Sequence, residues 1–139
     1  MVADDDYFQH LYYYGLFHKS LDLQVFEQED VNVQLSFSGE ELLEKLEKIK
    51  ACGCEKIRLV ILDYQMGDDK LNGVATAKKL RETGYGGPVL LRTSEKKEEL
   101  ERKHENFEGL IKDKVIDTIV PKSDSKLGKE LIEFYWRSQ

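Results

Sequence analysis

Acidic side chains stand at two places in the chain where chemistry could use them. Asp63 follows the apolar run Ile57–Leu62 directly, and a row of three aspartates, Asp4–Asp6, lies near the start. Carboxylates that converge on one crevice repel one another, and a divalent cation among them relieves that repulsion. Carboxylate oxygens suit Mg²⁺, which keeps water and phosphate oxygens as its other ligands. These residues therefore indicate a magnesium site.

A hydroxyl group and an ammonium group complete a set suited to phosphoryl transfer. Thr93 and Lys122, like Asp63, stand at the ends of apolar runs, and both can hold a phosphoryl oxygen. Phosphoryl transfer needs chiefly positioning and neutralisation of charge on the equatorial oxygens. Aspartate can act as the nucleophile and form an acyl phosphate. The residues predict Mg²⁺-dependent transfer of a phosphoryl group onto Asp63.

Strands that alternate with helices would bring these side chains together. The predicted α/β domain has a parallel sheet and right-handed crossovers, and its functional crevice lies at the carboxyl ends of the strands. Asp4–Asp6 follow the first strand, Asp63 the third, Thr93 the fourth and Lys122 the fifth. The strand candidates are Met1–Ala3, Leu23–Phe26, Val31–Phe37, Ile57–Leu62, Pro88–Leu91 and Val115–Val120.

Five helices are predicted from apolar residues at helical spacing. Phe8, Leu11, Tyr12 and Leu16 mark the first, and Phe8 and Leu11 are expected to face the core. The second runs from Glu40 to about Lys50, and the third from the Asn72-Gly73 turn to about Glu82. A long charged helix spans Glu95–Lys114. The last has Leu127, Leu131 and Tyr135 on one face.

Composition limits the class of protein. The 139 residues suit one domain, 1–139, and 40% hydrophobic with 35% charged residues suits a soluble globular protein. A formal charge of -6 disfavours nucleic-acid binding, and no apolar run reaches the roughly 18–20 residues that membrane insertion needs. The acidic N-terminus does not look like a signal peptide. Cys52 and Cys54 are expected to be reduced thiols, which favours a cytoplasmic location.

Four motifs in order resemble one known family. "VADDD", "LVILDYQM" followed by "NG", "PVLLRTS" and "DTIVPK" together resemble the receiver domain of two-component response regulators and hybrid histidine kinases, over nearly the whole chain. The resemblance implies a doubly wound, flavodoxin-like (βα)5 fold with a five-stranded parallel sheet in the order 2-1-3-4-5. It implies a histidine kinase or histidine phosphotransfer protein as phosphodonor, and an output domain or downstream protein that responds to an altered surface. A homodimer is left open.

The resemblance also implies a metal site. Asp4 and Asp5 match the acidic pair that holds Mg²⁺, Asp63 matches the third carboxylate, and the backbone carbonyl of Gln65 would be a further ligand. The alternative pair, Asp5 with Asp6, stays open because the sequence does not fix the register of the first strand.

The phosphoryl site follows from the same resemblance, with two departures. Asp63 matches the phosphoacceptor, Thr93 the hydroxyl residue that contacts the phosphoryl group, and Lys122 the family's lysine. Ser123 stands where the family usually has proline, so the Lys122–Ser123 bond is expected to be trans. Ile119 stands where the family usually has an aromatic residue that couples to the hydroxyl.

Two other functions compete with this interpretation. A degenerate receiver would keep the fold and act as a protein-protein docking module without phosphorylation. The short Met1–Ala3 strand, Ser123 and Ile119 favour it, and Mg²⁺ binding would discriminate. A small hydrolase with an aspartate nucleophile would need an acid or base two residues after Asp63, and Gln65 cannot serve.

Overall fold

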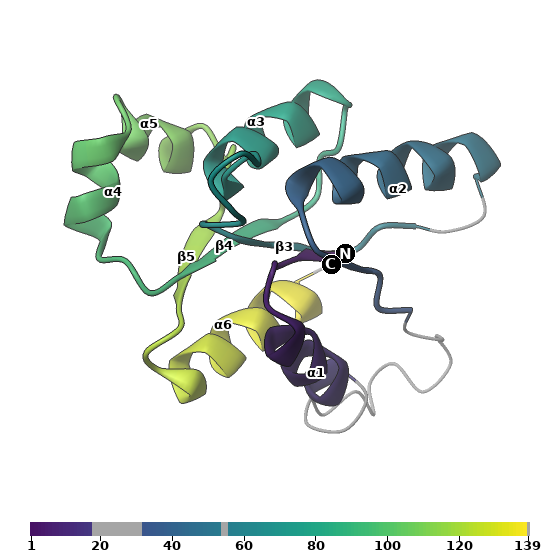
Figure 1. Cartoon of the computed structure of the whole chain (residues 1–139), viewed down its shortest axis with the longest axis horizontal. Coiled ribbons are helices and arrows are strands. Elements are labelled where there is room, and N and C mark those ends of the chain that lie inside the picture. The colour runs from purple at the N-terminus through teal and green to yellow at the C-terminus, as the bar shows by residue number, and fades with distance from the viewer. Residues whose placement is uncertain (18–31, 54–55, 139) are drawn as a thin grey trace.

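The computed structural model describes residues 1–17, 32–53 and 56–138. Its five strands form one parallel sheet in the order β2-β1-β3-β4-β5 (Figure 1). The doubly wound fold and the strand order predicted from the sequence are therefore confirmed. The strands are β1 (Val2–Ala3), β2 (Leu35–Ser36), β3 (Val60–Asp63), β4 (Val89–Thr93) and β5 (Thr118–Pro121).

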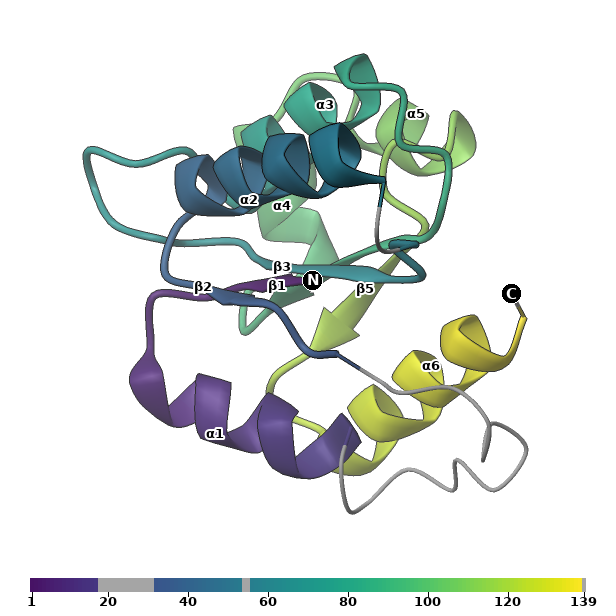
Figure 2. The same cartoon turned by 90° about the vertical axis from the view of Figure 1, so that its right-hand side faces the viewer.

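Helices cover both faces of this sheet, as Figures 1 and 2 show. On one face lie α2 (Gly39–Cys52), α3 (Gly73–Glu82), α4 (Lys97–Lys103) and α5 (Phe107–Lys112). On the other lie α1 (Tyr7–Gly15) and α6 (Ser125–Arg137). Of the candidate strands near residue 30, only the end of Val31–Phe37 forms β2, and Leu23–Phe26 lies outside the described residues.

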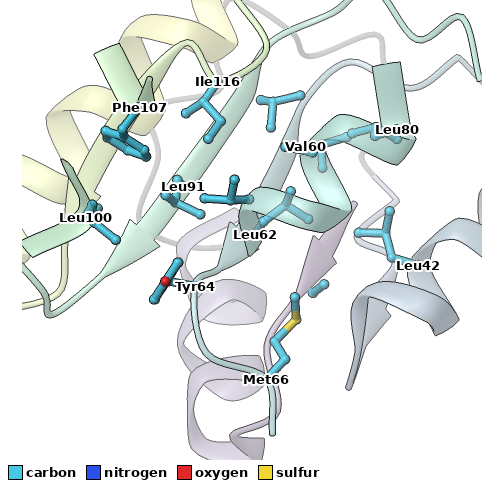
Figure 3. Close-up of a cluster of buried hydrophobic side chains, with 14 of the residues drawn as sticks. Leu42, Val60, Leu62, Tyr64, Met66, Leu80, Leu91, Leu100, Phe107 and Ile116 are labelled. Atoms are coloured by element: carbon cyan, nitrogen blue, oxygen red, sulfur yellow. The ribbon is translucent and has the colours of Figure 1, made fainter. Parts of the chain in front are cut away.

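Each face of the sheet has its own apolar cluster, because side chains alternate along a strand. Val60 and Leu62 of β3 point into the first cluster, under α2 to α5 (Figure 3), whereas Ile61 points into the second, over α1 and α6. The central strands are thus buried on both faces, as their unbroken apolar sequence predicts.

The prediction of one long helix over Glu95–Lys114 is wrong, because two short helices, α4 and α5, form there instead. His104 has extended backbone, and Asn106 is left-handed with a φ of 57°. A helix of that length would run about 30 Å, well beyond the five-residue strand β4 that it covers. The break allows Leu100 and Phe107 both to be fully buried in the first cluster.

The last helix is turned by one residue from the predicted orientation. Its buried residues are Gly128, Ile132 and Trp136, whereas Leu127 is 41% exposed. Gly128 faces Val120 of β5, where an added Cβ would make an ordinary van der Waals contact of 3.4 Å, and Ile132 and Trp136 pack in the second cluster. The packing of Ile132 and Trp136 therefore sets the inward face of α6.

Cys52 is disulfide-bonded, so the prediction of a reduced thiol is wrong for this residue. It ends α2, and Gly53 turns the chain with a φ of 63°. Cys54 lies outside the described residues. Cys52 therefore gives no support to a cytoplasmic location, which stays a prediction. Among the described helices, none combines the length and the apolar character that crossing a membrane requires.

Candidate functional site

The sheet brings three carboxylates together at its carboxyl edge. β1 and β3 are neighbours with Ala3 opposite Leu62, so the residues that follow, Asp4 and Asp63, lie side by side. One carboxylate oxygen each from Asp4, Asp5 and Asp63 lies within 4.8 Å of the others. Asp4 and Asp63 are buried, whereas Asp5 is exposed.

The donor set fits a magnesium ion. Asp4 Oδ2 is buried and accepts no hydrogen bond from any described residue. A buried carboxylate oxygen in that state costs free energy unless a cation compensates it. The three carboxylates supply the hard oxygen ligands that Mg²⁺ prefers, and the exposed side at Asp5 leaves room for water.

Asp6 has a different role from its two neighbours. Its carboxylate accepts a hydrogen bond from the Phe8 backbone N–H at 2.9 Å and so caps α1. Its own backbone N–H donates to Asp4 Oδ1 at 3.0 Å. The structure therefore gathers Asp4 and Asp5 with Asp63, and uses Asp6 to start the helix.

The buried face of α1 differs from the prediction at Phe8 and Leu11, whereas Leu16 is buried as its spacing predicted. Phe8 and Leu11 are 75% and 53% exposed, whereas His10 and Tyr13 are buried. Tyr13 packs in the second cluster, and His10 meets the backbone at the ends of β1 and β2.

His10 is a site residue that the sequence analysis missed. Its Nε2 lies 2.7 Å from the Asp4 carbonyl oxygen and 3.1 Å from that of Ser36. Both partners are acceptors only, so Nε2 must carry the hydrogen. The imidazole thereby joins the ends of two strands of only two residues each, β1 and β2. The sequence offered no signal for this role, since His10 lies outside the predicted inward stripe of Phe8, Leu11, Tyr12 and Leu16.

Lys122 and Thr93 lie at the same edge. Lys122 Nζ is 2.8 Å from Asp63 Oδ1 and 3.7 Å from Asp4 Oδ2. Thr93 Oγ1 accepts a hydrogen bond from the Glu95 backbone N–H at 3.0 Å and can still donate its own hydrogen. Every peptide bond within the described ranges is trans, including Lys122–Ser123, as predicted.

Burial makes the two inner carboxylates costly to ionise. It raises the pKa of Asp63 to about 6, with the negative Asp4 adding to the effect and Lys122 opposing it. Burial also raises the pKa of Asp4, against the Asp6 backbone N–H and Lys122, which lower it. A bound divalent cation would offset both costs.

Asp5, Asp63, Thr93 and Lys122 line one cleft of about 650 Å³, and Asp4 lies buried behind its lining. Glu95 stands at its rim, where its carboxylate accepts a hydrogen bond from Gln65 Nε2 at 3.0 Å. Lys103 of α4 holds the same carboxylate through two contacts of 2.8 and 2.9 Å. The cleft therefore has Asp63 and Lys122 at its floor and an ion pair at its rim.

Gly73 fixes the chain that follows Asp63. Its backbone N–H donates to the Tyr64 carbonyl at 2.8 Å, and a Cβ at Gly73 would lie 2.6 Å from the Asp63 carbonyl oxygen. Real side chains do not approach that closely, so glycine is required. The preceding Asn72 caps α3 by accepting from the Ala75 backbone N–H. The Asn-Gly pair thus seats α3 against the end of β3.

Several solved structures share this fold. The N-terminal domain of a response regulator/sensory box/GGDEF 3-domain protein from Carboxydothermus hydrogenoformans is 19% identical with a TM-score of 0.67, over 99% of this chain and 92% of that one. The receiver domain of the Francisella response regulator 1452 is 20% identical with a TM-score of 0.56, over 99% and 96%. The receiver domain of NtrX from Brucella abortus is 16% identical with a TM-score of 0.59, over 99% and 98%.

At these identities the comparison shows the fold, which is that of receiver domains. No sequence profile of a protein family matches the chain, and no curated protein matches it in sequence.

Proposed function

We propose that this chain is a receiver domain that accepts a phosphoryl group on Asp63 in a Mg²⁺-dependent reaction. The observation that carries the proposal is the close approach of the Asp4, Asp5 and Asp63 carboxylates, with Lys122 against that of Asp63. Acidic residues alone are common on protein surfaces. A buried carboxylate that faces both an ammonium group and two further carboxylates is what phosphoryl transfer to aspartate needs.

In the proposed reaction, an Asp63 carboxylate oxygen attacks the phosphorus of a phosphohistidine. A bond forms between that oxygen and phosphorus while the P–N bond breaks, and its electron pair stays with the donor imidazole. Lys122 is already in contact with Asp63 and binds one phosphoryl oxygen. The Thr93 hydroxyl, whose oxygen is fixed by the Glu95 N–H, donates to another.

Asp4, Asp5, Asp63 and the backbone carbonyl of Gln65 would hold the Mg²⁺ ion. When bound, the ion neutralises charge on the carboxylates and on the transferred group. Asp4 would supply a buried ligand, whose position is fixed by the Asp6 N–H and by His10. Asp5 would supply an exposed one, on the side open to water.

The phosphodonor in this proposal is a histidine kinase or histidine phosphotransfer protein. The acyl phosphate would then signal by altering the surface that an output domain or downstream protein contacts. The fold and the open cleft support this assignment, since a macromolecular donor needs its histidine to reach Asp63 from outside.

A degenerate receiver is the second candidate, and Ile119 is the observation that favours it. This side chain is partly buried in the first cluster, where an aliphatic group cannot form the hydroxyl–ring coupling of the family's usual switch. A docking module with the same fold would need neither Mg²⁺ nor the acidic pair.

Calorimetric titration with Mg²⁺ separates the two candidates. The phosphoacceptor proposal predicts saturable binding to the wild type and weaker binding to Asp63→Asn. The matched control is Asp124→Asn, which changes the same charge at the N-cap of α6, outside the cleft. Folded wild-type protein that binds no Mg²⁺ would contradict the proposal and favour the docking module.

A further inference from the structure

The residue after Asp63 makes a long-range contact that the phosphoryl chemistry does not use. The Tyr64 hydroxyl lies 2.6 Å from Nε2 of His104, forty positions along the chain. His104 stands in the break between α4 and α5. A single hydrogen bond therefore joins the segment that carries Asp63 to the point where the helical layer changes direction.

At the Asp63 end, Tyr64 is fixed to the sheet and cannot move independently of Asp63. Its backbone N–H donates to the Arg92 carbonyl at 3.0 Å, and its carbonyl accepts from the Gly73 N–H at 2.8 Å. The ring is buried in the first cluster, whose members include Leu100 of α4 and Phe107 of α5 (Figure 3). A rigid, packed ring carries a displacement of its backbone out to its hydroxyl.

At the other end, His104 is held between aromatic rings. Its ring meets Tyr64 edge to face at 5.5 Å between centroids and lies 6.3 Å from the Phe107 ring. Helices as short as α4, with seven residues, and α5, with six, have little stability of their own. Their arrangement therefore depends on tertiary contacts such as this one.

The chemistry of the two side chains gives the bond a direction, since a tyrosine hydroxyl is ordinarily uncharged near pH 7 and can donate. Burial lowers the pKa of His104, and Lys78 adds to that effect. A neutral phenol can then donate to the unprotonated Nε2 of a neutral imidazole.

We propose that the Tyr64–His104 hydrogen bond couples the phosphorylation state of Asp63 to the arrangement of α4 and α5. The inference rests on the proposed function. A phosphoryl group on Asp63 requires Lys122 to bind phosphoryl oxygen in place of the carboxylate oxygen that it now contacts at 2.8 Å. The resulting shift at the end of β3 reaches His104 through the Tyr64 ring. This route needs no aromatic residue at Ile119. By thermodynamic linkage, if phosphorylation changes the affinity of a partner for α4 and α5, that partner changes the phosphorylation equilibrium at Asp63 by the same factor.

Hydrogen exchange across residues 97–112, with and without a phosphoryl adduct formed from acetyl phosphate and Mg²⁺, tests the coupling. Tyr64→Phe and His104→Phe each remove one hydrogen-bonding group and keep an aromatic ring. The matched control is Tyr85→Phe, which removes a hydroxyl that donates to Pro88 at 3.0 Å, before β4 begins. Intact mass, measured on the same samples, reports the adduct.

Adduct formation is expected to change exchange over residues 97–112 in the wild type and in Tyr85→Phe. In Tyr64→Phe and His104→Phe, the change in exchange should be reduced by a factor of roughly three or more, because one buried hydrogen bond is lost. The double variant should resemble either single variant, since both remove the same bond.

Two results would overturn the coupling, and they differ. Adduct on every protein with an undiminished exchange response in Tyr64→Phe refutes the coupling and leaves the proposed function intact. Absence of adduct on the folded wild type refutes the proposed function and removes the coupling with it.

Discussion

Lys122 Nζ lies 2.8 Å from Asp63 Oδ1, although Asp63 ends β3 and Lys122 follows β5, and these strands are not neighbours. β4 lies between β3 and β5, so the long Lys122 side chain spans the carboxyl end of β4 to reach Asp63. Lys122 is the one cation paired with both buried carboxylates among the ion pairs of the described residues. The electrostatic balance of the cleft therefore depends on this side chain.

Removal of the Lys122 ammonium group tests this dependence through the stability of the protein. We expect Lys122→Met to destabilise the metal-free protein by about 2 kcal/mol, below the range for fully buried pairs because the lysine side chain is 25% exposed. Mg²⁺ should restore more stability to the variant than to the wild type. Urea unfolding with EDTA or with Mg²⁺ measures both effects.

Lys129→Met is the control, because its ion pair with Glu133 lies on the surface of α6 at 4.0 Å. Its effect should stay below about 0.5 kcal/mol. Equal stability of Lys122→Met and the wild type in EDTA would show that the cleft does not depend on Lys122.

The raised pKa of Asp63 predicts how stability varies with pH. Since that pKa is about 6 in the folded protein against 3.8 as the ordinary value, folding favours the protonated carboxyl. Its stabilising contribution is complete below about pH 3.8 and is lost as pH rises through about 6.

Asp63→Asn, which mimics the protonated carboxyl, should therefore be more stable than the metal-free wild type at pH 7.5. We expect a gain of about 1 to 2 kcal/mol, allowing for solvent in the adjoining cleft. The gain should shrink as pH falls from 7.5 to 5. Urea unfolding in EDTA over that range tests it, and a difference in free energy of unfolding that does not vary with pH would count against a perturbed Asp63.

Neighbouring aspartates allow a matched test of the metal ligands. Asp5→Asn and Asp6→Asn remove the same charge one residue apart, and asparagine at position 6 can still cap α1. Only Asp5→Asn should weaken Mg²⁺ binding, by roughly tenfold or more. Calorimetry decides: a larger loss in Asp6→Asn would make Asp5 and Asp6 the acidic pair.

His10 offers a test of how short strands support the site. His10→Leu removes the donor to the Asp4 and Ser36 carbonyls, which should cost about 1 to 3 kcal/mol and weaken Mg²⁺ binding. His10→Gln keeps an N–H group and should retain most of both. Unfolding and Mg²⁺ calorimetry on the two variants separate positioning of Asp4 from general loss of packing. Wild-type Mg²⁺ affinity in a folded His10→Leu protein would contradict the role.

The sequence predicted the sheet well because the apolar runs that identify its central strands are local features of the sequence. Unbroken apolar runs identify central strands, and each ends in a polar residue, as at Asp63 and Thr93. Once the strands are parallel, their carboxyl ends must meet. The convergence of those residues with Lys122 could therefore be inferred without knowing any contact.

The errors concern features set by contacts distant in sequence. The inward face of α1 includes His10, which meets the Ser36 carbonyl 26 positions away. That of α6 follows the packing of Ile132 and Trp136 in the second cluster. The break near His104 accompanies a bond to Tyr64, and helical periodicity in the charged run 95–114 contains no sign of that partner.

The central claim is tested most directly by the intact mass of the protein after incubation with acetyl phosphate and Mg²⁺. We predict one phosphoryl adduct on the wild type, released by hydroxylamine as an acyl phosphate should be. The adduct should be absent from Asp63→Asn and from samples with EDTA. A folded wild type that binds Mg²⁺ yet forms no adduct, or an equal adduct on Asp63→Asn, would contradict phosphoryl transfer to Asp63.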